Sequence, residues 1–163
     1  MQIKKTLPFT YVIIDDKINL QKERTKIMLK IFISSHGHLA SGMKSSLDIL
    51  IGNSDRIHIF DAYVDEKSVQ EVLDEFYKTV KEDDQIILLS DLLGGSVNST
   101  MFLYLDRPNT TLIAGINLAL VLELAVHQDN LTKEEIEKIV KDSREVLKII
   151  ENTNEPVVQD DFF

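Results

Sequence analysis

The sequence predicts an α/β protein with a doubly wound, mainly parallel four-stranded sheet and helices on both faces of that sheet. From Leu29 onward, short runs of apolar residues alternate with segments whose apolar residues follow a helical period. The central runs are apolar at nearly every position, which is typical of strands that are covered on both faces. The connections between such strands are expected to be right-handed crossovers.

The first strand and the first helix are expected between residue 30 and Gly52. Residues 30–34 are rich in isoleucine and phenylalanine, as in a buried strand. The helix after them should end at Gly52, because glycine adopts the left-handed conformation that closes many helices. Its inward stripe contains Met43, Leu47 and Leu50.

A second strand is expected at 56–60, and a second helix at 67–80. Asp65 precedes this helix and is the residue expected to cap its N-terminus, since a carboxylate can accept hydrogen bonds from the first backbone N–H groups. The inward face of the helix contains Val69, Val72, Leu73, Phe76 and Val80.

The same alternation continues to the fourth strand. Residues 85–89 form the most apolar strand, and residues 96–105 a short helix that Pro108 terminates. The fourth strand is expected at 110–114, and it leads into an almost entirely apolar helix at 117–127.

A last helix begins at Thr132, which forms a capping-box pattern with Glu135. Its predicted inward residues are Ile136, Ile139, Val140, Leu147 and Ile150. The tail PVVQDDFF is expected to form a final extended segment.

Residues 1–28 do not share the alternation, so the chain is divided into an N-terminal extension, 1–28, and a domain, 29–163. Two explanations of the extension stay open. It is an arm that packs on the domain or on a partner, or it precedes a natural start at Met28.

Composition excludes several classes of function. A net charge of −9 argues against nucleic acid or an anionic membrane as the main partner. The absence of cysteine excludes disulfides and cysteine-ligated zinc, and it fits a cytoplasmic protein. The apolar stretch from Ile116 to Val126 is too short to span a bilayer and contains Glu123. No cofactor is indicated.

Polar and glycine residues follow three of the predicted strands. In open parallel sheets the functional crevice lies outside the carboxyl ends of the strands, so these loops should lie near one edge of the sheet. They contain Ser34, Ser35, His36, Gly37 and His38 after the first strand, residues 90–96 after the third, and Gly115 and Asn117 after the fourth.

His36 and Asp91 are candidates for a nucleophile and its orienting carboxylate. A carboxylate that accepts one ring N–H of histidine fixes the tautomer and leaves the other nitrogen nucleophilic. The structural alternative for His36 is a hydrogen bond to a backbone carbonyl at the strand end. For Asp91 it is a cap of the helix at 96–105, a role that can coexist with orienting His36.

Gly94, Gly95 and Ser96 form a candidate anion-binding loop. Two glycines let the backbone turn tightly, and a helix start with a serine hydroxyl favours a phosphoryl group. The loop is neither a Walker motif nor a dinucleotide-binding motif, so direct use of ATP is not expected. A phosphoryl group would come from one protein and go to another, at a shallow, exposed site.

The segments IFISSHGHLASGM, ILLSDLLGGSVN and LIAGINLALVLE together resemble the mannose-type (mannose/fructose/sorbose) enzyme IIA component of the phosphoenolpyruvate-dependent sugar phosphotransferase system. The resemblance covers roughly residues 29–150. It implies that His36 is phosphorylated and hydrogen-bonded by Asp91, and that the phosphate-binding residues are Ser35, Gly94, Gly95, Ser96 and Asn117.

The resemblance also implies partners. The carrier protein HPr would donate the phosphoryl group, enzyme IIB would accept it on a histidine, and the membrane components IIC and IID would be reached indirectly. Family members form homodimers that exchange an antiparallel C-terminal strand, which offers a role for the tail VVQDDFF. The sugar is not indicated.

Two positions depart from the family pattern beside the site. Many relatives have an aromatic residue where this chain has Leu93, and proline where it has Val97. These changes bear on partner specificity and sugar class more than on the phosphorylation itself. The residues expected at the rim of the site are Gly37, His38, Leu92 and Leu93.

Other readings of the polar residues stay open. A regulatory module of the same fold would have its His36 phosphorylation state sensed by a partner, and a metal-binding module would use His36 and His38. His58 is expected to be a sheet residue. Glu123 is expected to be an interface or core carboxylate, with a role in dimerisation as the further possibility.

Overall fold

The computed structural model describes residues 28–52, 55–127 and 129–151. Its sheet consists of β1 (Leu29–His36), β2 (Ile57–Ala62), β3 (Gln85–Ser90) and β4 (Thr110–Ala114). All pairings are parallel, and the strand order is β2-β1-β3-β4. The predicted fold class is therefore confirmed.

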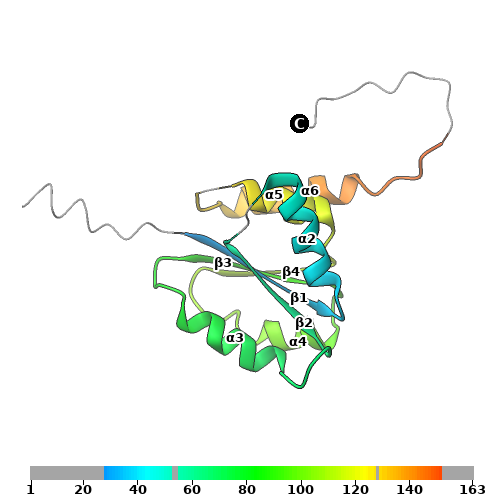
Figure 1. The fold of residues 1–163 in the computed structure, drawn as a ribbon. Coiled ribbons are helices and arrows are strands. Elements are labelled where there is room, and N and C mark those ends of the chain that lie inside the picture. The colour runs from blue at the N-terminus through cyan, green and yellow to red at the C-terminus, as the bar shows by residue number, and fades with distance from the viewer. Residues whose placement is uncertain (1–27, 53–54, 128, 152–163) are drawn as a thin grey trace, which may run out of the picture.

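Within the described residues, five helices cover the two faces of this sheet (Figure 1). On one face lie α2 (Leu39–Ile51), α5 (Leu118–Val126) and α6 (Lys133–Glu145). On the other face lie α3 (Val69–Lys78) and α4 (Ser96–Phe102).

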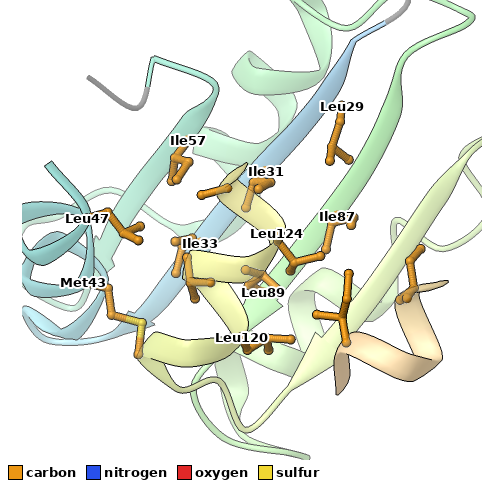
Figure 2. Close-up of a cluster of buried hydrophobic side chains, with 14 of the residues drawn as sticks. Leu29, Ile31, Ile33, Met43, Leu47, Ile57, Ile87, Leu89, Leu120 and Leu124 are labelled. Atoms are coloured by element: carbon orange, nitrogen blue, oxygen red, sulfur yellow. The ribbon is translucent and has the colours of Figure 1, made fainter. Parts of the chain in front are cut away.

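The two helical layers enclose two separate apolar cores, one on each side of the sheet. Ile31 and Ile33 of β1 point into the core under α2 and α5, together with Leu120 and Leu124 (Figure 2). Phe32 lies between them in sequence and packs in the opposite core. This alternation in a fully buried strand explains why the first strand is apolar at consecutive positions.

The ends of β1 and β3 form the switch point of the sheet. These strands are neighbours, but the chain leaves β1 into α2 on one face and leaves β3 into α4 on the other. The two loops therefore diverge, and the space between their starting points is where doubly wound proteins bind ligands.

The N-terminus of α3 corrects one prediction. Ser68, not Asp65, is the N-cap, and it forms a capping box with Glu71. Asp65 instead accepts a hydrogen bond from the Lys67 N–H at 2.9 Å, within the loop. Ser68 is the better N-cap because Glu71 stands three residues after it and can accept the backbone N–H of Ser68, which completes the capping box.

The last helix is shorter than predicted, although its Thr132–Glu135 capping box is confirmed. The helix ends at Glu145, and Leu147 and Ile150 are 89% and 88% exposed instead of inward. Leu50 of α2 is also about half exposed, so its predicted burial was wrong as well. All three side chains lie at or beyond the end of their helix, past the part that packs on the sheet.

Some predictions concern residues outside the described part of the chain. The extension at 1–28 is described only at Met28, whose N–H donates to Asp84 Oδ1 at 3.2 Å. The tail PVVQDDFF and its proposed strand exchange also lie outside it. Among the described residues, no helix is long and apolar enough to cross a membrane.

Candidate functional site

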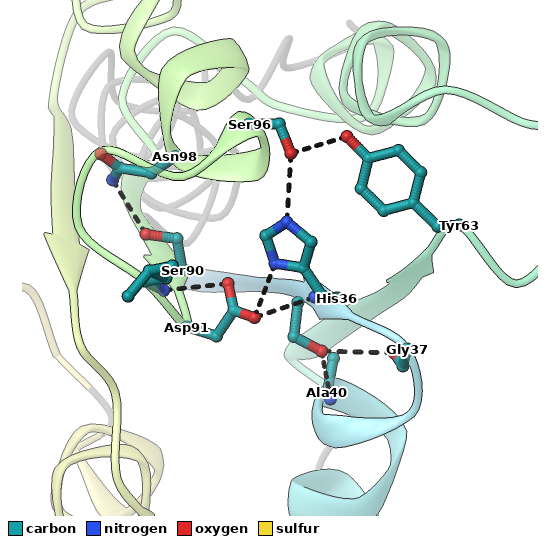
Figure 3. Close-up of polar contacts among 10 residues, drawn as sticks. His36, Gly37, Ala40, Tyr63, Ser90, Asp91, Ser96 and Asn98 are labelled. Atoms are coloured by element: carbon teal, nitrogen blue, oxygen red, sulfur yellow. Dashed lines mark hydrogen bonds and ion pairs between the residues drawn. The ribbon is translucent and has the colours of Figure 1, made fainter.

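His36 and Asp91 meet at the ends of β1 and β3, as the sequence predicts (Figure 3). His36 is the last residue of its strand, and Asp91 directly follows Ser90, the last residue of β3. One carboxylate oxygen of Asp91 accepts the backbone N–H of His36 at 2.9 Å and also lies 2.9 Å from Nδ1 of its ring. Backbone and side chain of His36 are thus held by a single oxygen.

The charge of Asp91 follows from these contacts. Partial burial favours a higher pKa, but hydrogen bonds from the His36 backbone and ring and from the Leu92 N–H outweigh it, so the pKa of Asp91 is below its ordinary value. A carboxylate opposite Nδ1 places the ring proton on that nitrogen. Nε2 is then the nitrogen with a free lone pair.

Ser96, at the start of α4, lies against this second nitrogen. Its Oγ is 3.1 Å from Nε2 of His36. The preceding Gly95 allows this approach, because a Cβ built on it would lie 3.3 Å from the carbonyl oxygen of Leu92 and 3.4 Å from Cε1 of His36. The loop therefore presents a hydroxyl to the nucleophilic nitrogen.

Asn98 holds the shape of the loop. Its side-chain oxygen accepts the Gly94 N–H at 3.0 Å, and its amide donates to Ser90 Oγ at 2.9 Å. The Gly95 N–H in turn donates to the Leu92 carbonyl at 3.2 Å. The N–H groups of Gly94 and Gly95 are thus already bonded within the loop, and Ser96 Oγ is the loop donor next to Nε2.

The side chains of two other predicted phosphate-binding residues, Ser35 and Asn117, form hydrogen bonds with backbone groups of nearby helices. Ser35 is buried, and its Oγ accepts the Ala40 N–H at 2.8 Å, which shapes the turn from β1 into α2. Asn117 caps α5 through Leu120 and donates to the Ser143 carbonyl at 2.7 Å, which ties α5 to α6. The structure does not bring the side chains of these two residues into the hydrogen-bonded group around His36.

Tyr63, which was not predicted, is part of that group. Its hydroxyl donates to Ser96 Oγ at 2.6 Å, and its ring stacks on the His36 ring with centroids 5.4 Å apart (Figure 3). The signal was present in the sequence. The loop after the second strand reaches the same sheet edge as the three loops that were selected, so the same topological rule applies to it.

His38 makes a second histidine–carboxylate contact nearby. Its Nδ1 lies 2.9 Å from Oδ2 of Asp61, the other oxygen of which accepts the Ser41 N–H. Partial burial favours a higher pKa for Asp61, but the bonds from Ser41 and His38 lower it overall. No group of three or more histidine, cysteine, aspartate or glutamate residues in the described chain is arranged to hold a metal ion.

The remaining polar candidates lie apart from the site. His58 is a residue of β2 that packs edge-on against Phe76, so its predicted place in the sheet is confirmed. Its pKa is lowered by burial and by the positive charges of Lys30 and Lys44. Glu123 is mostly exposed and lies 3.6 Å from His127, so it is not a core carboxylate.

The surroundings of His36 are exposed and partly apolar. The side chain of His36 is 41% exposed, and that of His38 is 73% exposed. Leu92 and Leu93 are 60% and 80% exposed, and Gly37 has a positive φ of 58° in the turn after the strand. An open nucleophile beside exposed leucines suits a protein partner better than an enclosed small molecule.

A family model agrees with this combination of fold and site. The EIIA-man model, described as the fructose IIA component of the phosphotransferase system, matches residues 30–154. The chain belongs to the EIIA-man family. As a member, it is a component of the sugar phosphotransferase system and, in general terms, a phosphocarrier with phosphotransferase activity.

Individual relatives of this EIIA-man protein are distant. The sorbose-specific EIIA component of Lacticaseibacillus casei is 22% identical over 64% of this chain and 77% of the relative. The fructose-specific EIIA component of Bacillus subtilis (strain 168) is 22% identical over 67% of this chain and 77% of the relative.

A solved structure supports the fold. The mannose/sorbose specific IIA subunit of the phosphotransferase system from Enterococcus faecalis superposes with a TM-score of 0.69 at 22% identity, covering 79% of this chain and 99% of that one.

Proposed function

We propose that this EIIA-man protein accepts a phosphoryl group from phospho-HPr on Nε2 of His36 and passes it to a histidine of enzyme IIB. The observation that carries the proposal is the set of contacts around one imidazole. Nδ1 faces the Asp91 carboxylate at 2.9 Å, and Nε2 faces the uncharged hydroxyl of Ser96 at 3.1 Å. A ring held in this way is a nucleophile with a defined reactive atom.

The transfer balances without a cofactor or an added proton. The Nε2 lone pair forms the new bond to phosphorus, while the bond from phosphorus to the donor nitrogen breaks and returns its electron pair to the donor. The Nδ1 proton stays in the hydrogen bond to Asp91, whose negative charge stabilises the positive charge that develops on the ring. Transfer to enzyme IIB is the same step in reverse, with a new acceptor.

Exposure of the site supports a protein donor. His36 lies at the surface between the loops after β1 and β3, so a phosphohistidine on another protein can reach Nε2 in line. The exposed Leu92 and Leu93 offer apolar surface for the docking partner. We place the protein in the cytoplasm, because HPr and the IIB acceptor must both reach this face.

A labelling experiment tests the first half of the proposal. The purified protein is incubated with enzyme I, HPr and labelled phosphoenolpyruvate, and we expect one acid-labile, base-stable phosphate per chain. A His36→Gln variant should remain folded and unlabelled. His127→Gln is the matched control, because His127 lies at the far end of α5, and it should label like the wild-type protein. An unlabelled wild-type protein would overturn the assignment.

Transfer to enzyme IIB tests the second half. Labelled protein is separated from the donor and mixed with enzyme IIB components, and we expect the label to move to one of them. A regulatory module would take the label from HPr and pass it to none of these acceptors, so that outcome would replace the transport role with the regulatory one.

A further inference from the structure

We propose that Tyr63 is a positioning residue for phosphoryl transfer: its hydroxyl sets the direction of the Ser96 hydroxyl, and its ring holds the plane of the His36 imidazole. The inference rests on the proposed function of His36. It assigns the loop after β2, which contributes neither the nucleophile nor its carboxylate, to the reaction.

The backbone of Tyr63 is in an unfavourable conformation. Its φ is +67°, in the left-handed region that bulky L-residues rarely adopt. Tyr63 is 67% exposed, so burial contributes little to offset this conformation. The contacts of its side chain with Ser96 and His36 are specific interactions that can help to stabilise it.

The hydrogen bonds around Tyr63 run in one direction. Asp91 holds the ring proton on Nδ1, so Nε2 accepts and the Ser96 hydroxyl donates to it. Ser96 has a single proton, so its oxygen must accept from the Tyr63 hydroxyl, which is 2.6 Å away. Tyr63 thereby keeps the Ser96 proton directed toward the reactive nitrogen.

This direction matters once the phosphoryl group arrives. Bond formation uses the Nε2 lone pair, and the Ser96 hydroxyl is then free to donate to a phosphoryl oxygen bound to the same nitrogen. The hydrogen bond from Tyr63 polarises Ser96 and makes it a better donor for that negative charge. The Ser96 hydroxyl therefore already lies beside the reactive nitrogen and does not have to move to it during the transfer.

The ring of Tyr63 acts on the imidazole itself. The two rings are inclined by only 18°, so Tyr63 covers one face of the His36 ring and limits its rotation away from Asp91. The aromatic face of Tyr63 also attracts positive charge. The His36 imidazole acquires such a charge when Nε2 is phosphorylated while Nδ1 keeps its proton.

A double-mutant cycle tests the coupling of Tyr63 to Ser96. Rates of labelling by phospho-HPr are measured for the wild-type protein, Tyr63→Phe, Ser96→Ala and the double variant. Loss of the tyrosine hydroxyl is expected to slow transfer by about five- to tenfold, the effect of one hydrogen bond, without changing the HPr concentration at half-maximal rate. In the Ser96→Ala background the same change should have little effect.

The control is Tyr77→Phe, which removes a tyrosine hydroxyl bonded to Thr110, away from the site. It should transfer at the wild-type rate.

A second variant, Tyr63→Leu, removes the ring stacking. Nitrogen NMR of His36 should then show a smaller excess of the tautomer protonated on Nδ1.

The outcomes separate this inference from the proposed function. A wild-type protein that labels normally while Tyr63→Phe labels at the same rate would overturn the role of Tyr63 and leave that of His36 intact. Additive effects in the cycle would overturn the coupling of Tyr63 to Ser96. An effect confined to the HPr concentration dependence would make Tyr63 a docking residue instead. Absence of labelling in the wild-type protein would overturn the proposed function itself.

Discussion

Asp91 fixes the orientation of the His36 ring and the nitrogen that carries its proton. The pKa of this carboxyl is low despite partial burial, because His36 donates to it from both backbone and ring. The carboxylate is therefore charged throughout the range in which cells work, and it becomes protonated only in acid. The low pKa and the ring orientation have the same cause.

Removal of the charge at Asp91 should slow phosphoryl transfer while the fold persists. In Asp91→Asn the amide oxygen can still accept from Nδ1, but the charge-assisted bond, worth about 1.5–3 kcal/mol, is lost. Labelling by phospho-HPr is expected to fall by roughly ten- to a hundredfold. Circular dichroism should match the wild-type spectrum, and an unchanged labelling rate would show that Asp91 only shapes the loop.

The two glycines of the 91–96 loop should respond differently to alanine. Gly94 has a φ of +74° and open space around it, so Gly94→Ala is expected to destabilise the fold by about 1 kcal/mol through backbone strain. Gly95 has an ordinary φ, but its added methyl would lie 3.3 Å from the carbonyl oxygen of Leu92 and in van der Waals contact with Cε1 of His36. Gly95→Ala is therefore expected to shift the loop against His36 and lose labelling rate on the order of tenfold, with a smaller loss of stability in urea than Gly94→Ala. The reverse pattern would contradict this structure of the loop.

Among the secondary-structure elements, β1 depends on a buried ion pair at its N-terminus. Asp84 is 2% exposed and accepts hydrogen bonds from the N–H groups of Met28 and Lys81, and Lys30 lies 3.1 Å from it. Burial favours a higher pKa, but these contacts lower the pKa of Asp84 overall. One carboxylate thus joins the start of β1 to the turn before β3.

The lowered pKa of Asp84 predicts a loss of stability in acid. The charged form stabilises the fold fully above its unfolded pKa of about 4, and this contribution disappears as the pH falls through the lower folded value. Asp84→Asn should cost roughly 3 kcal/mol at pH 7, because it leaves Lys30 without its carboxylate. Urea unfolding from pH 7 to pH 3 should show the difference between variant and wild-type protein shrinking at acidic pH.

The control for Asp84 is Asp142→Asn. Asp142 pairs with Lys138 on the exposed face of α6, where ion pairs contribute little, so the unfolding curve should hardly change. A difference that stayed constant down to pH 3 would show that the Asp84 charge is not the source of its effect.

At the level of the whole molecule, the sheet ends on one side at β4. Within the described residues β4 pairs only with β3, and all five of its residues are only partly buried. An edge with free backbone groups can accept another strand. We propose that the C-terminal tail of a second copy fills this edge, which would make the protein a homodimer.

Truncation of the chain after Glu151 tests this assembly. The shortened protein should retain the sheet and both cores, all of which lie within the described residues, and it should elute as a monomer where the full chain elutes as a dimer. A truncated protein that remained dimeric at the same concentration would show that the tail does not hold the two copies together.

The fold class followed from the sequence alone because buried parallel strands and amphipathic helices are local patterns. The cap of α6, the stop at Gly52 and the apolar strands needed no knowledge of distant residues. His36 and Asp91 were found in the same way, since the carboxyl ends of parallel strands meet at one edge.

Only the tertiary structure decided which side chains at that edge touch. Tyr63 reaches Ser96 across 33 positions of sequence, and Asn117 turns instead to Ser143 on α6. The exposure of Leu147 and Ile150 likewise depends on where the neighbouring helices end, not on helical spacing. Spacing along the chain determines which face a residue occupies, but contacts between loops depend on the packing that brings the loops together.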